Sequence, residues 1–247
     1  MPDLQRDDPQ ASTDETQQVV YAISHDLRAS ARHIKSFVQL LEGHLGEQLD
    51  DEARDYINRI GTAADSLQAK LDALTRLSRV ATGGVEPVPC SVREALNDAL
   101  TVLGPSIRGA RVIVGVDPMG MVIADPGQLV TVFVEVIGNA LKFCSEPTQI
   151  RVTSEADGDR CIVRVVDSGP GFRTGDCNAA FELFRRFHKA TIPGTGTGLA
   201  IVRRIGDRHR AGVTIDSSPD GGTTVQFTLP AVTEHTAGDR LARLAGP

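Results

Sequence analysis

The sequence lacks an apolar run long enough to span a bilayer. Its most apolar stretch, from Leu129 to Phe143, still contains Glu135 and Lys142, whereas a spanning helix needs about 20 predominantly apolar residues. A basic and apolar N-terminal leader is also missing, because the first ten residues are polar and acidic, so we expect no secretory signal. These absences predict a cytoplasmic protein without a membrane partner.

An excess of basic charge and paired cysteines are missing too. The formal net charge is -6 at pH 7, which argues against a nucleic-acid partner, since such proteins usually carry a basic surface. The 4 cysteines show no CxxC spacing and are too sparse for a disulfide scaffold, so we expect reduced thiols. With 40% apolar and 23% charged residues, the composition is that of an ordinary globular protein.

The N-terminal third predicts a helical hairpin. Residues 1–15 have too little apolar content to fold alone and are expected to form a disordered tail. Over residues 16–82, apolar side chains recur at alternating steps of three and four, which is the pattern of pairing helices. One stripe comprises Val20, Ile23, Leu27, Ser30, Ile34, Phe37 and Leu41, and the other Ile57, Ile60, Ala64, Leu67, Leu71 and Leu74. Two copies pairing as a four-helix bundle would cover the wide apolar face; packing against the rest of the same chain is the alternative.

The remainder predicts a linker and a second domain. Residues 83–90 contain two glycines and two prolines, which indicates a linker, and residues 91–231 alternate between helical and strand patterns. Helices are expected after Ser91, Asp125 and Gly198. Strands are expected at 111–116, 121–124, 150–155, 161–166, 212–216 and 223–229, with a hairpin turn at 157–158 longer than the tightest type. Residues 232–247 are expected to be a tail. The fold class is α+β: an antiparallel helical hairpin, then an α/β sandwich.

His25 is the first candidate reactive residue. With Val20 and Leu27 at heptad position a, His25 falls at position f, opposite the apolar stripe, so its side chain is expected to face solvent. Its surroundings, AISHDLRASARHIKSFVQLL, resemble the phosphoacceptor segment of sensor histidine kinases, especially the kinase modules of bacterial phytochromes. The resemblance implies that His25 attacks the γ-phosphate of ATP. Asp26 is then the candidate to orient the ring and raise its basicity.

The same segment departs from the family pattern at two positions. Relatives commonly have a proline where this chain has Ser30, so we expect a straighter first helix. Relatives that also dephosphorylate their partner use Thr or Asn four residues after the histidine, and this chain has Ala29 there. The departure predicts weak phosphatase activity.

Residues 135–143 resemble the N box of the GHKL ATPase superfamily. Residues three and four apart share a helix face, so Glu135, Asn139 and Lys142 are expected to point together. The resemblance makes Asn139 the ligand of Mg²⁺, which prefers oxygen donors, and places Lys142 near the phosphates. Glu135 stands where GHKL ATPases carry a water-activating glutamate and histidine kinases often carry asparagine.

Three further segments resemble the rest of that nucleotide site. In residues 165–172 the resemblance makes Asp167 the acceptor for the adenine amino group. Residues 180–187 resemble the F box, with Arg186 reaching the γ-phosphate, inside an expected lid from about 173 to 193. Glycines let backbone N–H groups approach phosphate at the start of a helix. The expected nucleotide-binding residues outside the N box are Asp167, Gly169, Gly171, Gly194, Gly196, Gly198 and Leu199.

Together, these segments predict a two-component histidine kinase. It would bind ATP and Mg²⁺, phosphorylate His25 as a homodimer, and pass the phosphoryl group to an Asp of a response-regulator receiver domain, with input from a separate or upstream sensor. Two alternatives stay open: a phosphotransfer or scaffold protein whose GHKL-like domain is inactive, and a GHKL ATPase, which Glu135 supports. The other histidines show no metal-ligand spacing, so no transition-metal site is expected.

Overall fold

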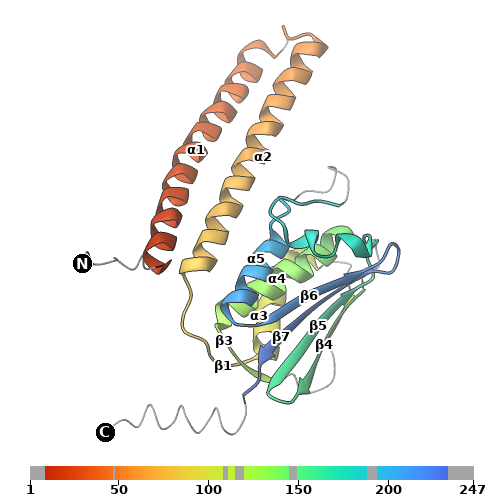
Figure 1. Ribbon diagram of the computed structural model, residues 1–247. Coiled ribbons are helices and arrows are strands. Elements are labelled where there is room, and N and C mark those ends of the chain that lie inside the picture. The colour runs from red at the N-terminus through yellow and green to blue at the C-terminus, as the bar shows by residue number, and fades with distance from the viewer. Residues whose placement is uncertain are drawn as a thin grey trace, which may run out of the picture. The chain divides into compact units, whose positions relative to one another are not determined.

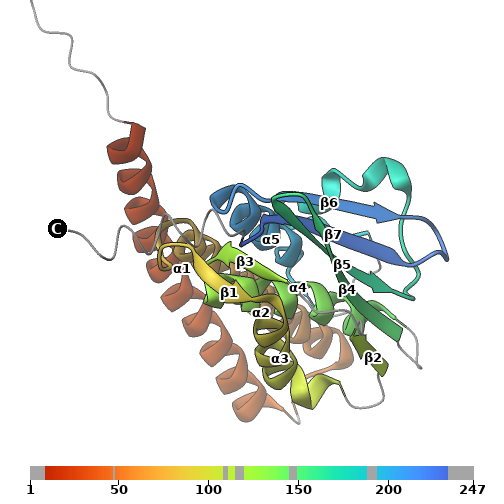
Figure 2. The ribbon, with the colours of Figure 1, turned by 90° about the horizontal axis from the view of Figure 1, so that it is seen from below.

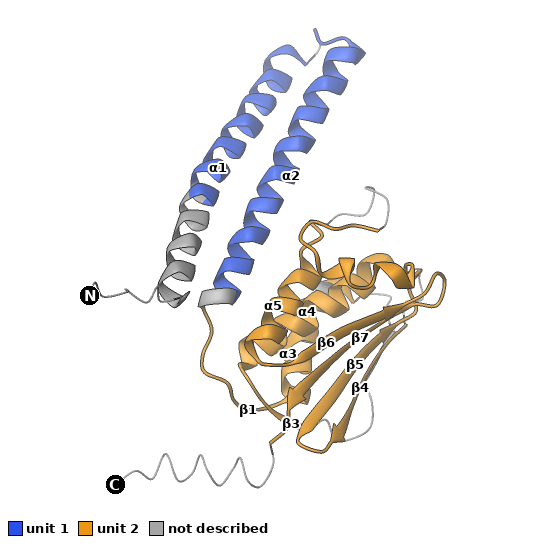
Figure 3. Ribbon diagram, viewed as in Figure 1, with its two compact units in different colours: residues 1–82 blue, residues 83–247 orange. Residues whose placement is uncertain are grey.

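The computed structural model describes residues 9–46, 48–107, 111–114, 120–144, 149–187 and 194–232. The chain divides into two compact units, residues 1–82 and residues 83–247 (Figure 3). The first unit is all helical and the second is mixed. Within the described residues no helix is long and apolar enough to cross a membrane.

The first unit is a hairpin of two long helices, α1 (Pro9–Leu45) and α2 (Asp51–Thr82), which run side by side (Figure 1). The helix α1 begins at Pro9, so residues 9–15, which the sequence assigned to a disordered tail, are helical. Proline is favoured at the first helical position. Each residue added to an existing helix forms one hydrogen bond while only that residue becomes ordered, so a helix can continue over polar residues. Residues 1–8 of the expected tail lie outside the described residues.

The buried contact between α1 and α2 uses a different stripe on α1 from the one that the sequence suggested. Ala31 is completely buried, and Ser24 and Val38, which lie seven positions on either side of it, are buried too. On α2 the buried residues include Ile57, Ala64 and Leu71, again seven residues apart. On α1 the buried residues therefore lie one position along from the stripe that the sequence suggested, whereas on α2 they belong to the suggested stripe.

Polar contacts made by Arg28 and Lys35 flank that helix pair. The Arg28 guanidinium donates to Asp72 at 2.8 Å and to the Thr75 hydroxyl at 2.8 Å. Lys35 pairs with Asp65 at 2.6 Å. Exposed pairs of this kind contribute about 0–1 kcal/mol each, so they fix the register of the two helices more than they stabilise them.

The large apolar side chains of the hairpin remain exposed in the single chain. Phe37 is 66% exposed and Leu40 is 63% exposed. The others that are exposed are Ile23, Leu27, Ile34, Leu41, Tyr56, Ile60 and Leu67. Fully burying one such side chain is worth about 1.5–3 kcal/mol, so this apolar face has a strong tendency to associate.

The second unit is built on a five-stranded sheet in the order β2-β4-β5-β7-β6. The strands are β2 (Arg111–Val114), β4 (Gln149–Asp157), β5 (Arg160–Asp167), β6 (Gly212–Ser217) and β7 (Thr223–Pro230). Only the β2–β4 pair is parallel among these described strands. The β4–β5 turn has just two residues, Gly158 and Asp159, so the expectation of a longer turn was wrong.

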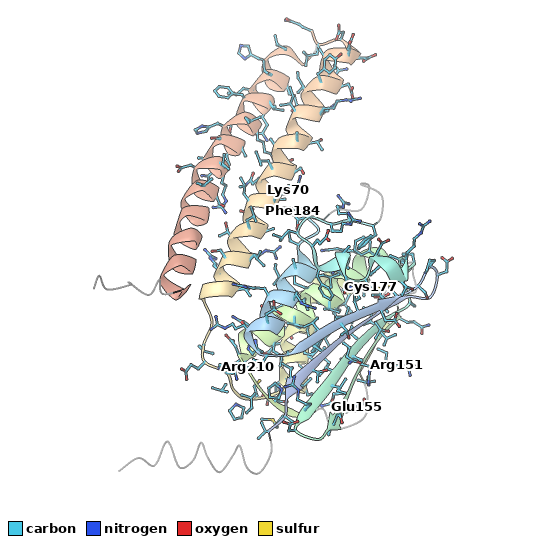
Figure 4. All side chains as sticks on the ribbon, in the orientation of Figure 1. Lys70, Arg151, Glu155, Cys177, Phe184 and Arg210 are labelled. Atoms are coloured by element: carbon cyan, nitrogen blue, oxygen red, sulfur yellow. The ribbon has the colours of Figure 1, made fainter. Side chains whose placement is uncertain are left out.

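Three helices cover one face of this sheet: α3 (Val92–Leu103), α4 (Pro126–Phe143) and α5 (Gly198–Arg208) (Figure 2). Alternate residues of the strands point toward them, as the period of a strand requires. Val163 on β5 is completely buried, and Phe133 on α4 meets Phe227 on β7 edge to face at 5.6 Å. On the opposite face, Arg151 and Glu155 of β4 are exposed (Figure 4).

Part of the expected linker is a strand. The strand β1 (Val88–Ser91) pairs antiparallel with β3 (Met121–Ala124), so only residues 83–87 connect the units without regular structure. A strand containing Pro89 is possible here because this sheet has just two strands, and a proline that cannot donate is tolerated at an edge. The last described residue, Val232, donates to the Met121 carbonyl at 2.9 Å, and residues 233–247 lie outside the described residues.

Candidate nucleotide site

Asp167 ends strand β5 and is held by the turn that follows. Its Oδ1 accepts the backbone N–H of Gly169 at 2.8 Å and that of Thr223 at 3.2 Å. Burial raises the pKa of this carboxyl above its usual value, and the two backbone N–H groups act in the opposite direction. A half-buried acceptor at the end of a strand is well placed to receive a hydrogen from a ligand amino group.

Gly171 brings the backbone of this turn against the next loop. It has a φ of 57°, and a Cβ at this position would overlap the Ser218 carbonyl oxygen and lie 2.9 Å from that of Gly222. Only glycine adopts this conformation without strain and also leaves room for the carbonyl groups. The DSGPG segment (residues 167–171), which begins with Asp167, is thereby fixed in one conformation.

The N box and the glycine-rich segment meet at Gly198. A Cβ on Gly198, the first residue of α5, would lie 2.6 Å from Glu135 Oε2 and 3.5 Å from Asn139 Nδ2. Glu135 and Asn139 share one face of α4 and are half-buried, as their four-residue spacing predicts. The structure therefore brings three expected site residues together at the positive end of a helix, where anions are favoured.

The same glycine segment contacts the start of the expected lid. The Phe184 N–H donates to the Gly196 carbonyl at 2.9 Å, and a Cβ on Gly196 would lie 2.5 Å from the Arg185 carbonyl oxygen. Phe172 stacks on Phe187 at 4.7 Å between ring centroids. Phe184 is exposed (Figure 4). The F-box segment thus rests on both the DSGPG turn and the glycine-rich segment.

The remaining expected site residues of this unit are placed but less constrained. Lys142 is exposed one turn beyond Asn139, and Arg186 is exposed in the F-box segment. Leu199 is half-buried on α5, and Gly194 lies at the exposed start of the glycine-rich segment. Short 3₁₀ helices occupy Thr174–Asp176 and Ala179–Phe181 within the expected lid, whose residues 188–193 lie outside the described part.

Sequence reasoning missed a clamp at the other end of α4. Asp125 caps α4 by accepting the N–H of Gly127 at 2.9 Å, and its second oxygen accepts the N–H of Val85 at 2.8 Å. The Asp125 N–H donates to His209 Nε2 at 2.8 Å, and His209 Nδ1 lies 2.8 Å from the Ile205 carbonyl. Since Nε2 is an acceptor, the buried imidazole is neutral with its proton on Nδ1. The clamp joins the connecting segment, α4 and α5.

The expected phosphoacceptor lies in the first unit. His25 is in α1, and its side chain lies outside the described residues. Arg32 and Gln39, which occupy the same heptad position one and two repeats later, are both exposed. Asp26 is exposed, and its backbone carbonyl accepts the Ser30 hydroxyl at 3.2 Å. A hydroxyl bonded to the carbonyl four residues back tends to bend a helix slightly, but α1 continues as one helix through Ser30.

The described residues contain no group of three or more His, Cys, Asp or Glu side chains that could hold a metal ion. A magnesium ion bound with nucleotide needs few protein ligands, because phosphate oxygens and water supply most of its coordination. Asn139, close to Gly198 and Glu135, has the amide oxygen that such an ion prefers. The residues present therefore fit a nucleotide-bound magnesium ion.

Comparisons with known proteins agree with this arrangement. Residues 124–233 match HATPase_c, the histidine kinase-, DNA gyrase B- and HSP90-like ATPase family. The phytochrome-like protein Cph1 of Synechocystis is 31% identical over 212 residues, which is 85% of this chain and 28% of Cph1. The mycobacterial sensor histidine kinase MprB has a TM-score of 0.53 at 25% identity, covering 59% of this chain and 97% of that one. Full-length ShkA in complex with AMPPNP has a TM-score of 0.62 at 24% identity, covering 87% of this chain and 46% of that one.

These findings show which known proteins residues 124–233 and the chain resemble. Residues 124–233 match the HATPase_c family, and the chain is homologous to proteins named sensor histidine kinases and phytochrome-like kinases. The α+β fold expected from the sequence is confirmed by its likeness to histidine kinase structures. The chain spans less than a third of the length of the curated relatives Cph1 and Nostoc cyanobacterial phytochrome A.

Proposed function

We propose that this chain is the kinase module of a two-component system, which uses ATP to phosphorylate His25. The observation that carries the proposal is the convergence of Glu135, Asn139 and Gly198, in the same unit as the DSGPG turn that holds Asp167. This arrangement lies in a domain of an ATP-binding family. The relative ShkA was solved in complex with AMPPNP, which further supports a nucleotide as the ligand.

In this proposal each part of the site has a separate task. Asp167 accepts a hydrogen from the adenine amino group, and the DSGPG glycines let the base approach the backbone. The backbone N–H groups of residues 194–199 and the positive end of α5 bind the phosphates, with Lys142 nearby. Asn139 holds Mg²⁺, which neutralises phosphate charge during transfer.

The transfer step joins a ring nitrogen of His25 to the γ-phosphorus while the bond to the β–γ bridging oxygen breaks, and ADP leaves. A neutral imidazole is a competent nucleophile near pH 7, and Asp26 orients the ring. Arg186 offsets the charge on the phosphoryl group. Glu135, half-buried beside Gly198, is proposed to act as the base at the reacting end of the nucleotide. The phosphoryl group then passes to the Asp of a response-regulator receiver domain.

We further propose that the chain works as a homodimer in the cytoplasm, with input from a separate or upstream sensor. The exposed apolar side chains of the hairpin, such as Phe37 and Leu40, support pairing of two copies as a four-helix bundle. The free cysteines Cys90, Cys144, Cys161 and Cys177 support a reducing compartment. With the helix and strand bounds of the structure, the proposed domains are the hairpin at 9–82, the linker at 83–87 and the catalytic domain at 88–231.

A GHKL ATPase that hydrolyses ATP is the second candidate, and Glu135 at the water-activating position favours it. In that case phosphate would be released without a labelled protein. The inactive-scaffold alternative would instead show no nucleotide binding at all. Both alternatives are therefore separable from the kinase by measuring binding and labelling on the same samples.

The test is calorimetric titration with ATP and Mg²⁺, followed by incubation with γ-labelled ATP. We expect His25→Gln to retain ATP affinity and lose labelling, and Asn139→Ala to lose both. His33→Gln on the same helix and Asn97→Ala on α3 replace exposed residues of the same types and should behave as the unmodified protein. Labelling that survives in His25→Gln would refute the proposed phosphoacceptor.

A further inference from the structure

Asp167 has a third hydrogen-bond donor besides the two backbone N–H groups. The thiol of Cys144 donates to Asp167 Oδ1 at 3.8 Å, across 23 positions of sequence. Cys144 is the C-cap residue of α4, and Asp167 is the last residue of β5. The end of the N-box helix is thereby bonded to the carboxylate at the end of the neighbouring strand.

All three donors reach the same oxygen of the carboxylate. Gly169, Thr223 and Cys144 bond to Oδ1, and within the described part of the chain no donor reaches Oδ2. A Cβ on Gly169 would lie 2.8 Å from Oδ1 and 3.2 Å from the Cys144 sulfur, so these groups are tightly packed. The carboxylate is held by one oxygen and leaves its other oxygen as an acceptor for an external donor.

We propose that Cys144 is a positioning residue for nucleotide recognition, because its S–H fixes Asp167 so that Oδ2 receives the adenine amino group. This inference rests on the proposed function, in which Asp167 is the adenine acceptor. Cys144 itself touches neither the nucleotide nor the phosphoryl group in this account. Its effect is confined to how Asp167 is oriented and how readily Asp167 ionises.

The chemical state of the thiol fits this role. Burial, and then the charge of Asp167, raise the pKa of Cys144 to about 11, so the sulfur keeps its proton at neutral pH and can donate. In return, the S–H bond favours the ionised form of Asp167 and lowers its pKa against the effect of burial. Among the described residues, Cys144 is the titratable group hydrogen-bonded to Asp167.

The first test compares Cys144→Ala with Cys144→Ser by calorimetric ATP titration of the full chain from pH 5 to 8. We expect Cys144→Ala to weaken ATP binding about 3- to 10-fold and to lose affinity at a higher pH on acidification. Cys144→Ser, whose hydroxyl is again a donor, should restore both affinity and pH profile. If Cys144 only supported the fold, replacing it would not shift the pH at which ATP affinity is lost on acidification, and the serine variant would not restore the affinity.

Cys90 provides a matched control. Its thiol is also half-buried, bonds the Ala124 carbonyl at 3.8 Å, and has a pKa raised by burial. Its bond to Ala124 places Cys90 near the start of α4, whereas Cys144 caps the end of that helix, whose 18 residues make it about 27 Å long. Cys90→Ala should leave ATP affinity unchanged, and bound ATP should slow alkylation of Cys144 but not of Cys90.

The outcomes separate this inference from the proposed function. If the unmodified protein does not bind ATP, both fail. If it binds ATP but a folded Cys144→Ala variant keeps the same affinity and pH profile, the positioning role is refuted and the kinase proposal stands. If Cys144→Ala does not fold, the serine variant and the alkylation of Cys144 decide: normal affinity in the serine variant together with ATP protection supports the role, and loss of either refutes it.

Discussion

Replacing Gly171 with alanine tests the geometry of the turn that holds Asp167. At a φ of 57°, an alanine costs roughly 1–2 kcal/mol because its Cβ crowds the backbone. The overlap with the Ser218 carbonyl and the 2.9 Å approach to that of Gly222 add about 1–3 kcal/mol, as overpacking does. We therefore expect Gly171→Ala to destabilise the second unit by about 2–5 kcal/mol.

Gly158 is the matched control for that substitution. Its φ of 59° is nearly the same, but a Cβ there meets nothing within 4 Å, so Gly158→Ala should cost only the backbone part, about 1–2 kcal/mol. Urea unfolding followed by hydrogen exchange of β5 and β7 measures both variants. ATP titration should show weaker binding in Gly171→Ala alone. Equal destabilisation of the two variants would refute the reasoning from the close approach.

Three other substitutions test separate parts of the account. Asp167→Asn removes a carboxylate whose pKa is raised by burial. The stability contributed by its protonated form is present below the ordinary pKa and is lost as pH rises through the raised pKa, so in urea unfolding the variant should gain stability relative to the unmodified protein across that interval. Its ATP affinity should fall about 10- to 100-fold. His209→Ala leaves the buried Asp125 N–H without its acceptor and should cost about 1–3 kcal/mol in thermal unfolding, whereas Arg204→Ala, at an exposed position of α5, should cost less than about 0.5 kcal/mol. Phe37→Asp places a charge on the exposed apolar face and should dissociate the proposed dimer in analytical ultracentrifugation. Gln39→Asp should leave the proposed dimer intact. A dimer that persists in Phe37→Asp would exclude this face as the interface.

Features set by neighbouring residues in sequence were predictable. Ser91 and Asp125 cap α3 and α4 as expected, because a capping side chain bonds an N–H only two or three positions away. The joining of Glu135 and Asn139 on one face follows from helical periodicity. The strand β1 was missed, since two prolines over residues 87–90 are typical of a linker and only its pairing with β3 makes it a strand.

Features that depend on distant pairs were not predictable. The hydrogen bond between Asp125 and His209 joins residues 84 positions apart, and no local pattern predicts that these two residues meet. The Cys144–Asp167 contact likewise requires the end of α4 to meet the end of β5. In the hairpin, the apolar stripe indicated helix pairing. On α1, however, the buried contact uses Ser24, Ala31 and Val38 instead of the expected stripe, because close packing of two helices favours small side chains such as Ala31.

Localising the phosphoryl group on the protein is the most direct test of the central claim. After incubation with ATP and Mg²⁺, tandem mass spectrometry under neutral conditions identifies the modified residue. The account predicts one acid-labile, base-stable phosphoryl group on the peptide containing His25, and none when Asn139 is replaced by alanine. Release of phosphate from ATP with an unmodified His25 peptide would contradict it.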